Sequence, residues 1–243
     1  MKKLAGGRKS HFQKHIQDQW REGKFSFQDT LHDERLKLFH LFFHDKMEQL
    51  HQVYRKIYED NKNVLDMMLK MDIPTPDELK IPAETTLSID LFAEVEKSKN
   101  DFNKAFYKKA LAIVEKAEAF GFDLNATSTE KIVDQILQNR IDDLYHQPQL
   151  QNCTELLEML EIMSNLKLKI NEGALQDVMF KILKEKLPQL IDEIVATNIL
   201  DERFQLVTGL IQLAYNLNFA TSLYKQKLLT IEKKISDDPR FWP

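Results

Sequence analysis

Apolar residues recur with a period close to 3.6 along almost the whole chain, and this period limits the fold more than any other feature. The longest such run covers residues 32–70, and its apolar positions include Leu36, Phe39, Phe43, Met47, Leu50, Tyr54, Ile57 and Tyr58. A period of 3.6 places these residues on one face of an α-helix. The sequence therefore predicts one long helix over residues 32–70.

Few residues interrupt this pattern, because the 243 residues include only 6 glycines and 7 prolines. The stretch "MDIPTPDELKIP" (71–82) ends the long helix, and Thr75 caps a short helix with Pro76 at its first position. The remaining signals predict helices at residues 10–20, 83–97, 101–120, 127–146, 150–165, 172–197, 201–217 and 221–235.

Local signals refine these helices. Thr127 and Glu130 have the spacing of a capping box, Asn171 is a predicted N-cap, and Pro188 is predicted to kink the helix over 172–197. The alternating "LKLKI" (166–170) is interpreted as an extended linker, because one strand cannot make a sheet. The predicted fold class is all-α, a helical bundle of about eight or nine helices that includes one long helix.

The domain organisation predicted from this pattern is simple. Residues 1–31 form an N-terminal helix and linker, and residues 32–243 form an α-helical bundle. A subdivision of the bundle near residues 121–128, where Gly121 closes a helix, is left open.

The composition limits the kinds of partner that we expect this protein to bind. The 34 basic and 38 acidic residues are mixed throughout, so no surface for nucleic acid is predicted. No apolar run reaches the ~18 residues of a membrane span, and no apolar segment of a secretory signal follows the basic N-terminus. The single cysteine, Cys153, is expected to be a buried, inert thiol in a reducing compartment. We therefore expect a cytoplasmic protein with no nucleic-acid or membrane partner.

The segment "HLFFHDKMEQLH" (40–51) holds four side chains of the types that bind transition metals: His40, His44, Glu48 and His51. On a helix they lie at about 0°, 40°, 80° and 20°, so they share one stripe. This stripe spans about 16 Å, too far for four ligands to meet at one ion. A metal would need ligands from another helix, and we expect a hydrated flank with no metal and no cofactor.

Other patterns give no catalytic residue. The carboxylate pairs Asp33–Glu34, Asp142–Asp143 and Asp237–Asp238 are adjacent residues. Neighbours on a helix point about 100° apart, so such a pair is not an acid–base couple by itself. The segment "AGGRKS" (5–10) lacks the spacing of a phosphate-binding loop.

The segment "DERLKLFHLFFHDKMEQLHQVYRKIYEDNKNVLDMMLKMDIPTP" (33–76) resembles a helical C-terminal region that follows the catalytic barrel in a subset of glycoside hydrolase family 57 proteins. In that region "D-E" opens a long helix, "AYRxLYExxxxLM" follows, and "LGIPLP" ends it. Within this segment the positions that match the family motif are Asp33, Glu34, Tyr54, Tyr58, Glu59, Pro74 and Pro76. Later segments add the family-motif positions Glu84, Asn171 and Gln176. Gly173 and Asp177 depart from the pattern, where an aromatic residue and an asparagine are expected.

The resemblance implies an accessory function. The family's enzymes, which process α-glucans, have a (β/α)7-type barrel with a Glu nucleophile and an Asp acid/base. This chain lacks the strand–helix alternation of that barrel, so no catalytic residue is carried over. The resemblance implies a non-catalytic domain that packs on a catalytic barrel of the same or a neighbouring polypeptide and stabilises it.

An alternative is left open, a stand-alone helical scaffold for protein interactions that binds a partner helix or forms a homo-oligomer. Its predicted surface is the Leu- and Met-rich segment "TELLEMLEIMSNLKLKI" (154–170). The other interpretation of that segment is core packing.

Overall fold

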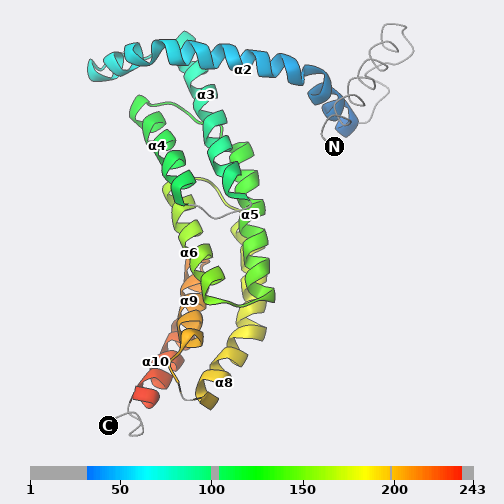
Figure 1. The fold of residues 1–243 in the computed structure, drawn as a ribbon, viewed down its shortest axis with the longest axis vertical. Helices are drawn as coiled ribbons and strands as arrows, with labels where there is room; N and C mark the ends of the chain where they lie inside the picture. The colour runs from blue at the N-terminus through cyan, green and yellow to red at the C-terminus, as the bar shows by residue number, and fades with distance from the viewer. Residues whose placement is uncertain (1–31, 100–103, 198, 237–243) are drawn as a thin grey trace. The chain divides into compact units, whose positions relative to one another are not determined.

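The helical period of the sequence corresponds to an all-helical structure (Figure 1). The computed structural model describes residues 32–99, 104–197 and 199–236, and within these ranges no strand is present, which confirms the predicted class. The helices are α2 (His32–Lys70), α3 (Asp77–Glu96), α4 (Lys104–Phe120), α5 (Thr127–His146), α6 (Leu150–Asn165), α7 (Glu172–Lys181), α8 (Leu187–Thr197), α9 (Glu202–Asn216) and α10 (Ser222–Ser236). The helix predicted at residues 10–20 lies outside the described residues.

The chain divides into two compact units, Met1–Thr86 and Leu87–Pro243, and α3 contributes residues to both. The turn near residues 121–128, where the sequence left a subdivision open, lies within the second unit. The predicted boundary between residues 31 and 32 lies at the edge of the described residues.

In the first unit, the 39-residue helix α2 confirms the predicted long helix. Tyr58 and Leu65 of α2 are buried, and so is Ala83 of α3. Tyr58 and Leu65 are seven residues apart and therefore lie on one face of α2. The ammonium group of Lys62 lies 5.1 Å from the centre of the Tyr58 ring, a cation–π contact.

The predicted break at Pro82 is wrong, because α3 continues through this proline. The helix starts at Asp77, one residue after the predicted first position Pro76, and the N–H groups of Leu79 and Lys80 donate to the carbonyl oxygen of Pro76. Pro82 removes one hydrogen bond of the helix interior, an effect that usually costs about 3 kcal/mol. Burial of Pro82 and Ala83 offsets this cost, so packing overrides the local preference.

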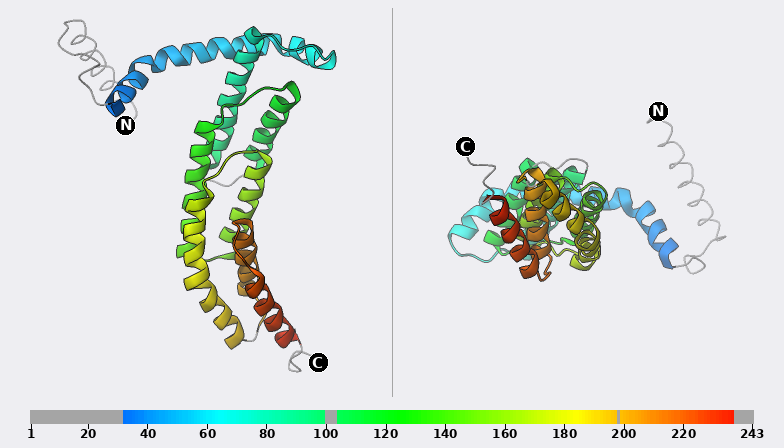
Figure 2. Two further views of the ribbon diagram at one scale, coloured as in Figure 1. Left: turned by 180° about the vertical axis from the view of Figure 1, so that it is seen from behind. Right: turned by 90° about the horizontal axis from the view of Figure 1, so that it is seen from below.

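The second unit has one continuous apolar core. Helix α5 packs against α6 and α7, and α9 packs against α6, α8 and α10. These helices run roughly along a common direction in Figure 1, and the right view of Figure 2 looks along that direction. The apolar residues of 154–170 lie in this core, with buried side chains at Leu156, Met159, Leu160, Met163, Leu166 and Leu168. The interaction surface predicted there is therefore wrong, and the core interpretation is confirmed.

Four of the described helices end on a residue with a left-handed backbone, namely Asp72, Gly121, Lys167 and Asn218. At the end of α6, the N–H of Leu168 donates to Met163 O and the N–H of Lys167 donates to Ser164 O. These two bonds define a Schellman motif, which satisfies carbonyls that the helix leaves without partners. Residues 168–170 then continue without regular structure, which confirms the predicted linker.

The predicted irregularity of the helix over 172–197 is present, but it precedes Pro188. Residues Ile182–Lys186 form a π turn between α7 and α8, and the N–H of Leu187 donates to Ile182 O. Pro188 has no N–H to offer the carbonyl of Lys184, and its ring crowds that carbonyl. The widened turn accommodates this crowding without ending the helix.

The two predicted helix caps differ in outcome. Asn171 caps α7 as expected, because its Oδ1 accepts from the N–H of Ala174. The capping box of Thr127 and Glu130 is wrong, since α5 has no side-chain cap bond at its N-cap residue. Glu130 Oε1 accepts instead from the N–H of Lys169, at 3.2 Å.

Candidate functional site

The histidine flank of α2 contains two described histidine side chains. His44 and Glu48 are exposed and His51 is half-buried, whereas the side chain of His40 lies outside the described residues. Among the side chains that the structure describes, no group of three or more metal-binding residues converges on one point. The described part of the flank therefore offers too few converging ligands for a structural zinc site.

Cys153 is fully buried in α6, as predicted. Burial raises the pKa of its thiol to about 12, because the thiolate would lose its hydration. A nucleophilic cysteine needs a lowered pKa and access to its substrate. The surroundings of Cys153 provide neither.

The carboxylate pairs hold no described acid–base couple. Asp142 accepts from Gln138 Nε2 at 3.3 Å within α5, and Asp143 is exposed. The side chains of Asp33 and Glu34, and residues Asp237 and Asp238, lie outside what the structure describes.

The family-motif residues of the first unit have structural positions. Tyr58 is buried and Tyr54 is half-buried, and Glu59 forms an exposed ion pair with Lys62 at 2.6 Å. Glu84 lies 3.6 Å from the ammonium group of Lys80. Pro74 and Pro76 form the turn between α2 and α3. The described side chains among these residues support the helices and their connection.

The motif residues of the second unit join three helices. The N–H of Asn171 donates to Asp134 of α5 at 2.8 Å, and Gln176 Nε2 donates to the carbonyl oxygen of Leu217, after α9, at 3.0 Å. Asn218 adds a bond to Glu172 at 3.1 Å. These bonds position the start of α7 between α5 and the end of α9.

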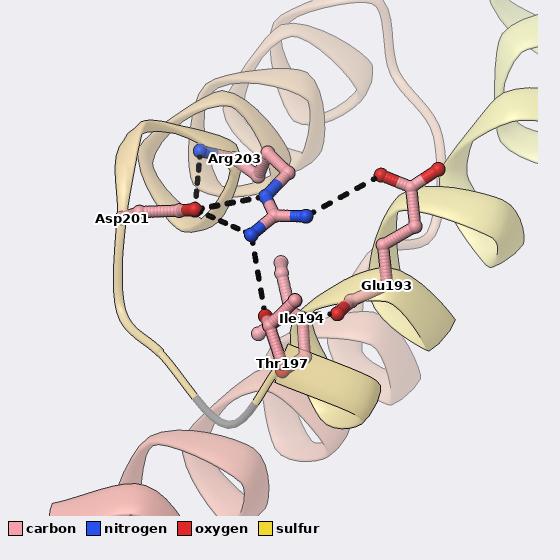
Figure 3. Close-up of polar contacts among 5 residues, drawn as sticks. All are labelled: Glu193, Ile194, Thr197, Asp201 and Arg203. Carbon is pink, nitrogen blue, oxygen red and sulfur yellow. Dashed lines mark hydrogen bonds and ion pairs between the residues drawn. The ribbon is translucent and has the colours of Figure 1, made fainter.

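An ionic cluster that the sequence analysis missed connects α8 to α9 (Figure 3). Both carboxylate oxygens of Asp201 accept from the guanidinium group of Arg203, and Asp201 also caps α9 by accepting from the N–H of Arg203 at 3.0 Å. Arg203 reaches Thr197 Oγ1 at 3.2 Å and Glu193 at 3.7 Å. These contacts lower the pKa of the Asp201 carboxyl and raise the pKa of Arg203. The sequence signal that could have predicted this cluster is the N-cap residue Asp201 with Arg203 two positions later.

Two open grooves of the second unit are lined by polar and apolar side chains together. The larger, of about 660 Å³, lies between α6 and α9 and includes Glu158, Glu161 and Glu172. The other, of about 520 Å³, lies between α5 and the start of α7 and includes Gln135 and Asn139. Side chains of several kinds mix in both grooves, so neither defines a catalytic constellation.

A third groove, between α9 and α10, is mainly apolar. Its volume is about 370 Å³, and its lining residues are Phe204, Thr208, Ile211, Gln212, Lys225, Leu228, Leu229 and Glu232. Leu229 is 63% exposed, and Leu223 of the same helix is 77% exposed. We call this surface the α9–α10 groove.

A second apolar surface runs along α2. We call it the α2 seam, and its residues are Phe43, Met47, Leu50, Tyr54, Ile57, Asn61, Val64 and Met68. Phe43 and Met47 are 43% and 45% exposed, and Leu50 and Val64 are also exposed. The other four side chains are half-buried. Long exposed apolar surfaces of this kind mark interaction sites more often than catalytic ones.

Comparisons with known protein families, with curated proteins and with solved structures found no match. None of the described helices is both long enough and apolar enough to cross a membrane. The α9–α10 groove and the α2 seam are the two exposed apolar surfaces on which a proposal about function can be built.

Proposed function

We propose that this chain is a non-catalytic helical accessory domain of a glycoside hydrolase family 57-like, glucan-processing enzyme. It packs on the catalytic barrel and stabilises it. The observation that supports this proposal is the α9–α10 groove with its exposed leucines, together with the resemblance of residues 33–76 to the family's C-terminal region.

The α9–α10 groove has the chemistry of a site that receives a helix. Phe204, Ile211 and Leu228 give it an apolar lining, and Lys225 and Glu232 add charges of both signs. Barrels of the (β/α) type carry an outer ring of helices, and an amphipathic helix binds in an apolar groove through its apolar face. Burial of Leu229 in this way would contribute up to about 2 kcal/mol.

The positions of the motif residues support a non-catalytic role. Tyr58 packs in the first unit, and Asn171 and Gln176 fasten α7 to its neighbours. Side chains with such contacts hold the helices in place, which suits a domain that docks on a partner better than one that acts on a substrate. A domain of this kind would stabilise the catalytic barrel by binding its folded state.

The stand-alone interaction scaffold remains the second candidate, and the α2 seam favours it. The two candidate functions differ in whether the chain is associated with a catalytic barrel. An accessory domain is joined to a barrel or co-purifies with one, whereas a scaffold does neither.

The deciding experiment is an immunoblot of the source cells with an antibody to this chain, followed by mass spectrometry of the purified antigen. We expect a band far above 28.6 kDa, or a co-purifying partner, with peptides of a (β/α) barrel. A band at 28.6 kDa without barrel peptides overturns the proposal.

A matched pair of variants then tests the docking surface. Leu229→Glu places a charge in the α9–α10 groove, whereas Lys227→Glu changes an exposed residue two positions away. We expect Leu229→Glu alone to lower the melting temperature of the barrel in the native polypeptide. Equal effects of the two variants would exclude the groove as the docking surface.

A further inference from the structure

The α2 seam has the register of a coiled coil. Its residues are spaced alternately by four and three positions, so Met47, Tyr54, Asn61 and Met68 are a positions, and Phe43, Leu50, Ile57 and Val64 are d positions. The f positions, on the opposite face, are Asp45, Gln52, Glu59 and Asp66. All four f residues are exposed and polar. The pattern is therefore that of a helix that pairs with another helix along its a and d positions.

The buried side chains of α2 lie at one edge of the seam, and the seam residues next to them, Tyr54, Asn61 and Met68, are half-buried. Tyr58 and Leu65, which are buried, are e positions beside the seam. The seam itself keeps exposed side chains at Phe43, Met47 and Val64. A second helix could therefore lie along the seam without displacing the buried residues.

The polar side chain of Asn61 determines which partner helix can pack along the α2 seam. It is the one polar residue among the eight seam positions, and it occupies an a position. One N–H of its carboxamide already donates to Ile57 O at 2.8 Å. The second N–H and Oδ1 can form a reciprocal pair with an identical carboxamide, because a positions face a positions in a parallel, in-register pair.

An antiparallel pair would satisfy Asn61 poorly. In that arrangement an a position faces d positions, and every d position of the seam is apolar. The carboxamide of Asn61 would then lose water without gaining a partner, which disfavours the antiparallel arrangement. A foreign helix would need its own polar residue at the matching place, whereas a second copy supplies one automatically.

We infer that α2 pairs with α2 of a second copy of this chain, as a parallel, in-register coiled coil along the α2 seam. The α9–α10 groove takes no part in this pairing. The inference therefore goes beyond the proposed function and does not depend on it.

The first test measures the mass of the purified chain by sedimentation equilibrium over a range of concentrations. We expect a dimer of twice 28.6 kDa that dissociates on dilution. Leu50→Lys places a charge at an exposed d position and should abolish the dimer, whereas Gln52→Lys at an f position should preserve it. Circular dichroism checks that both variants keep the helical content of the wild type.

The second test uses disulfide formation to determine the register of the two α2 helices. Val64→Cys places a thiol at an exposed d position, and Asp66→Cys places one at an exposed f position. In a parallel, in-register pair only Cys at position 64 can meet its copy. Cys153 is buried, so it does not compete. We expect a covalent dimer for Val64→Cys and none for Asp66→Cys.

Three results would overturn the inference. They are a monomer at the highest soluble concentration, a dimer that survives Leu50→Lys, and equal cross-linking at positions 64 and 66. Because these measurements need only this chain, their failure would leave the proposal of a catalytic barrel as partner untouched.

Discussion

A Cβ atom built at Gly209 would lie 2.9 Å from the Sγ of Cys153, closer than real Cβ atoms approach other atoms. The two residues belong to α9 and α6, the pair of helices with the most extensive contact in the second unit. The missing side chain of Gly209 therefore allows α9 to lie close to the buried thiol. Neither residue was singled out for this contact by the sequence, because the contact joins positions 56 residues apart.

We expect Gly209→Ala to lower the free energy of unfolding by about 1–3 kcal/mol, because the added methyl group overpacks the contact with Cys153. Cys153→Ala removes the Sγ, so the double variant should lose less stability than the sum of the single variants. Urea denaturation of all four proteins measures this coupling. Gly173→Ala is the control, since its Cβ would meet Asn171 Oδ1 at an ordinary 3.7 Å. Strict additivity at positions 153 and 209 would contradict the interpretation.

The thiol of Cys153 should be almost unreactive in the folded protein. With a pKa raised to about 12 by burial, roughly one thiol in ten thousand is ionised at pH 8. A chromogenic disulfide reagent should therefore react slowly in buffer and rapidly in denaturant, where the pKa returns to its ordinary value. Rapid reaction without denaturant would show that the α6–α9 contact opens.

Lys167 is a second site where stability can be changed predictably. Its backbone is left-handed, with φ at +55°, and a residue with a Cβ pays about 1–2 kcal/mol there. Lys167→Gly should therefore raise the free energy of unfolding by about 1 kcal/mol, a shift of about 2 °C in Tm. The ion pair with Glu118 that is lost is exposed and contributes little.

Lys169→Gly is the matched control for this change. Lys169 lies two residues further along the same linker, is exposed and lacks a left-handed backbone. Glycine there adds only freedom to the unfolded chain, so Tm should fall. A rise in Tm for both variants, measured by calorimetry, would argue against the Schellman motif as the cause.

The helix boundaries could be predicted from the sequence wherever the signal was local. The predicted ranges 32–70 and 150–165 coincide with α2 and α6, because apolar period and flanking turn residues act within a few positions. The same local reasoning failed at Pro82, where burial keeps α3 continuous. It also failed at Glu130, whose carboxylate accepts from the N–H of Lys169, 39 residues away.

The candidate surfaces were harder to predict than the helices. The apolar positions of α2 were evident in the sequence, but a period cannot tell which apolar face the chain itself covers. Tyr58 is buried and Met47 is exposed on the same helix, and only the position of the neighbouring residues decides between them. The segment 154–170 shows the converse, since its apolar residues suggested a surface and lie in the core.

The cluster around Asp201 predicts how stability depends on pH. The hydrogen bonds from Arg203 hold the pKa of the Asp201 carboxyl below its ordinary value in the folded state. A lowered folded pKa means that the charged carboxylate stabilises the folded protein above the unfolded pKa, about 3.9. This stabilisation is lost as the pH falls through the folded pKa.

Asp201→Asn isolates this effect, because asparagine retains a side-chain oxygen that can cap α9 and lacks the charge. We expect the variant to be less stable than the wild type at pH 7 and the difference to shrink between about pH 5 and pH 2. Urea denaturation across this range measures the difference, with Asp192→Asn, at an exposed carboxylate of α8, as the control. A difference that stays constant down to pH 2 would mean that the charge of Asp201 does not stabilise the connection between α8 and α9.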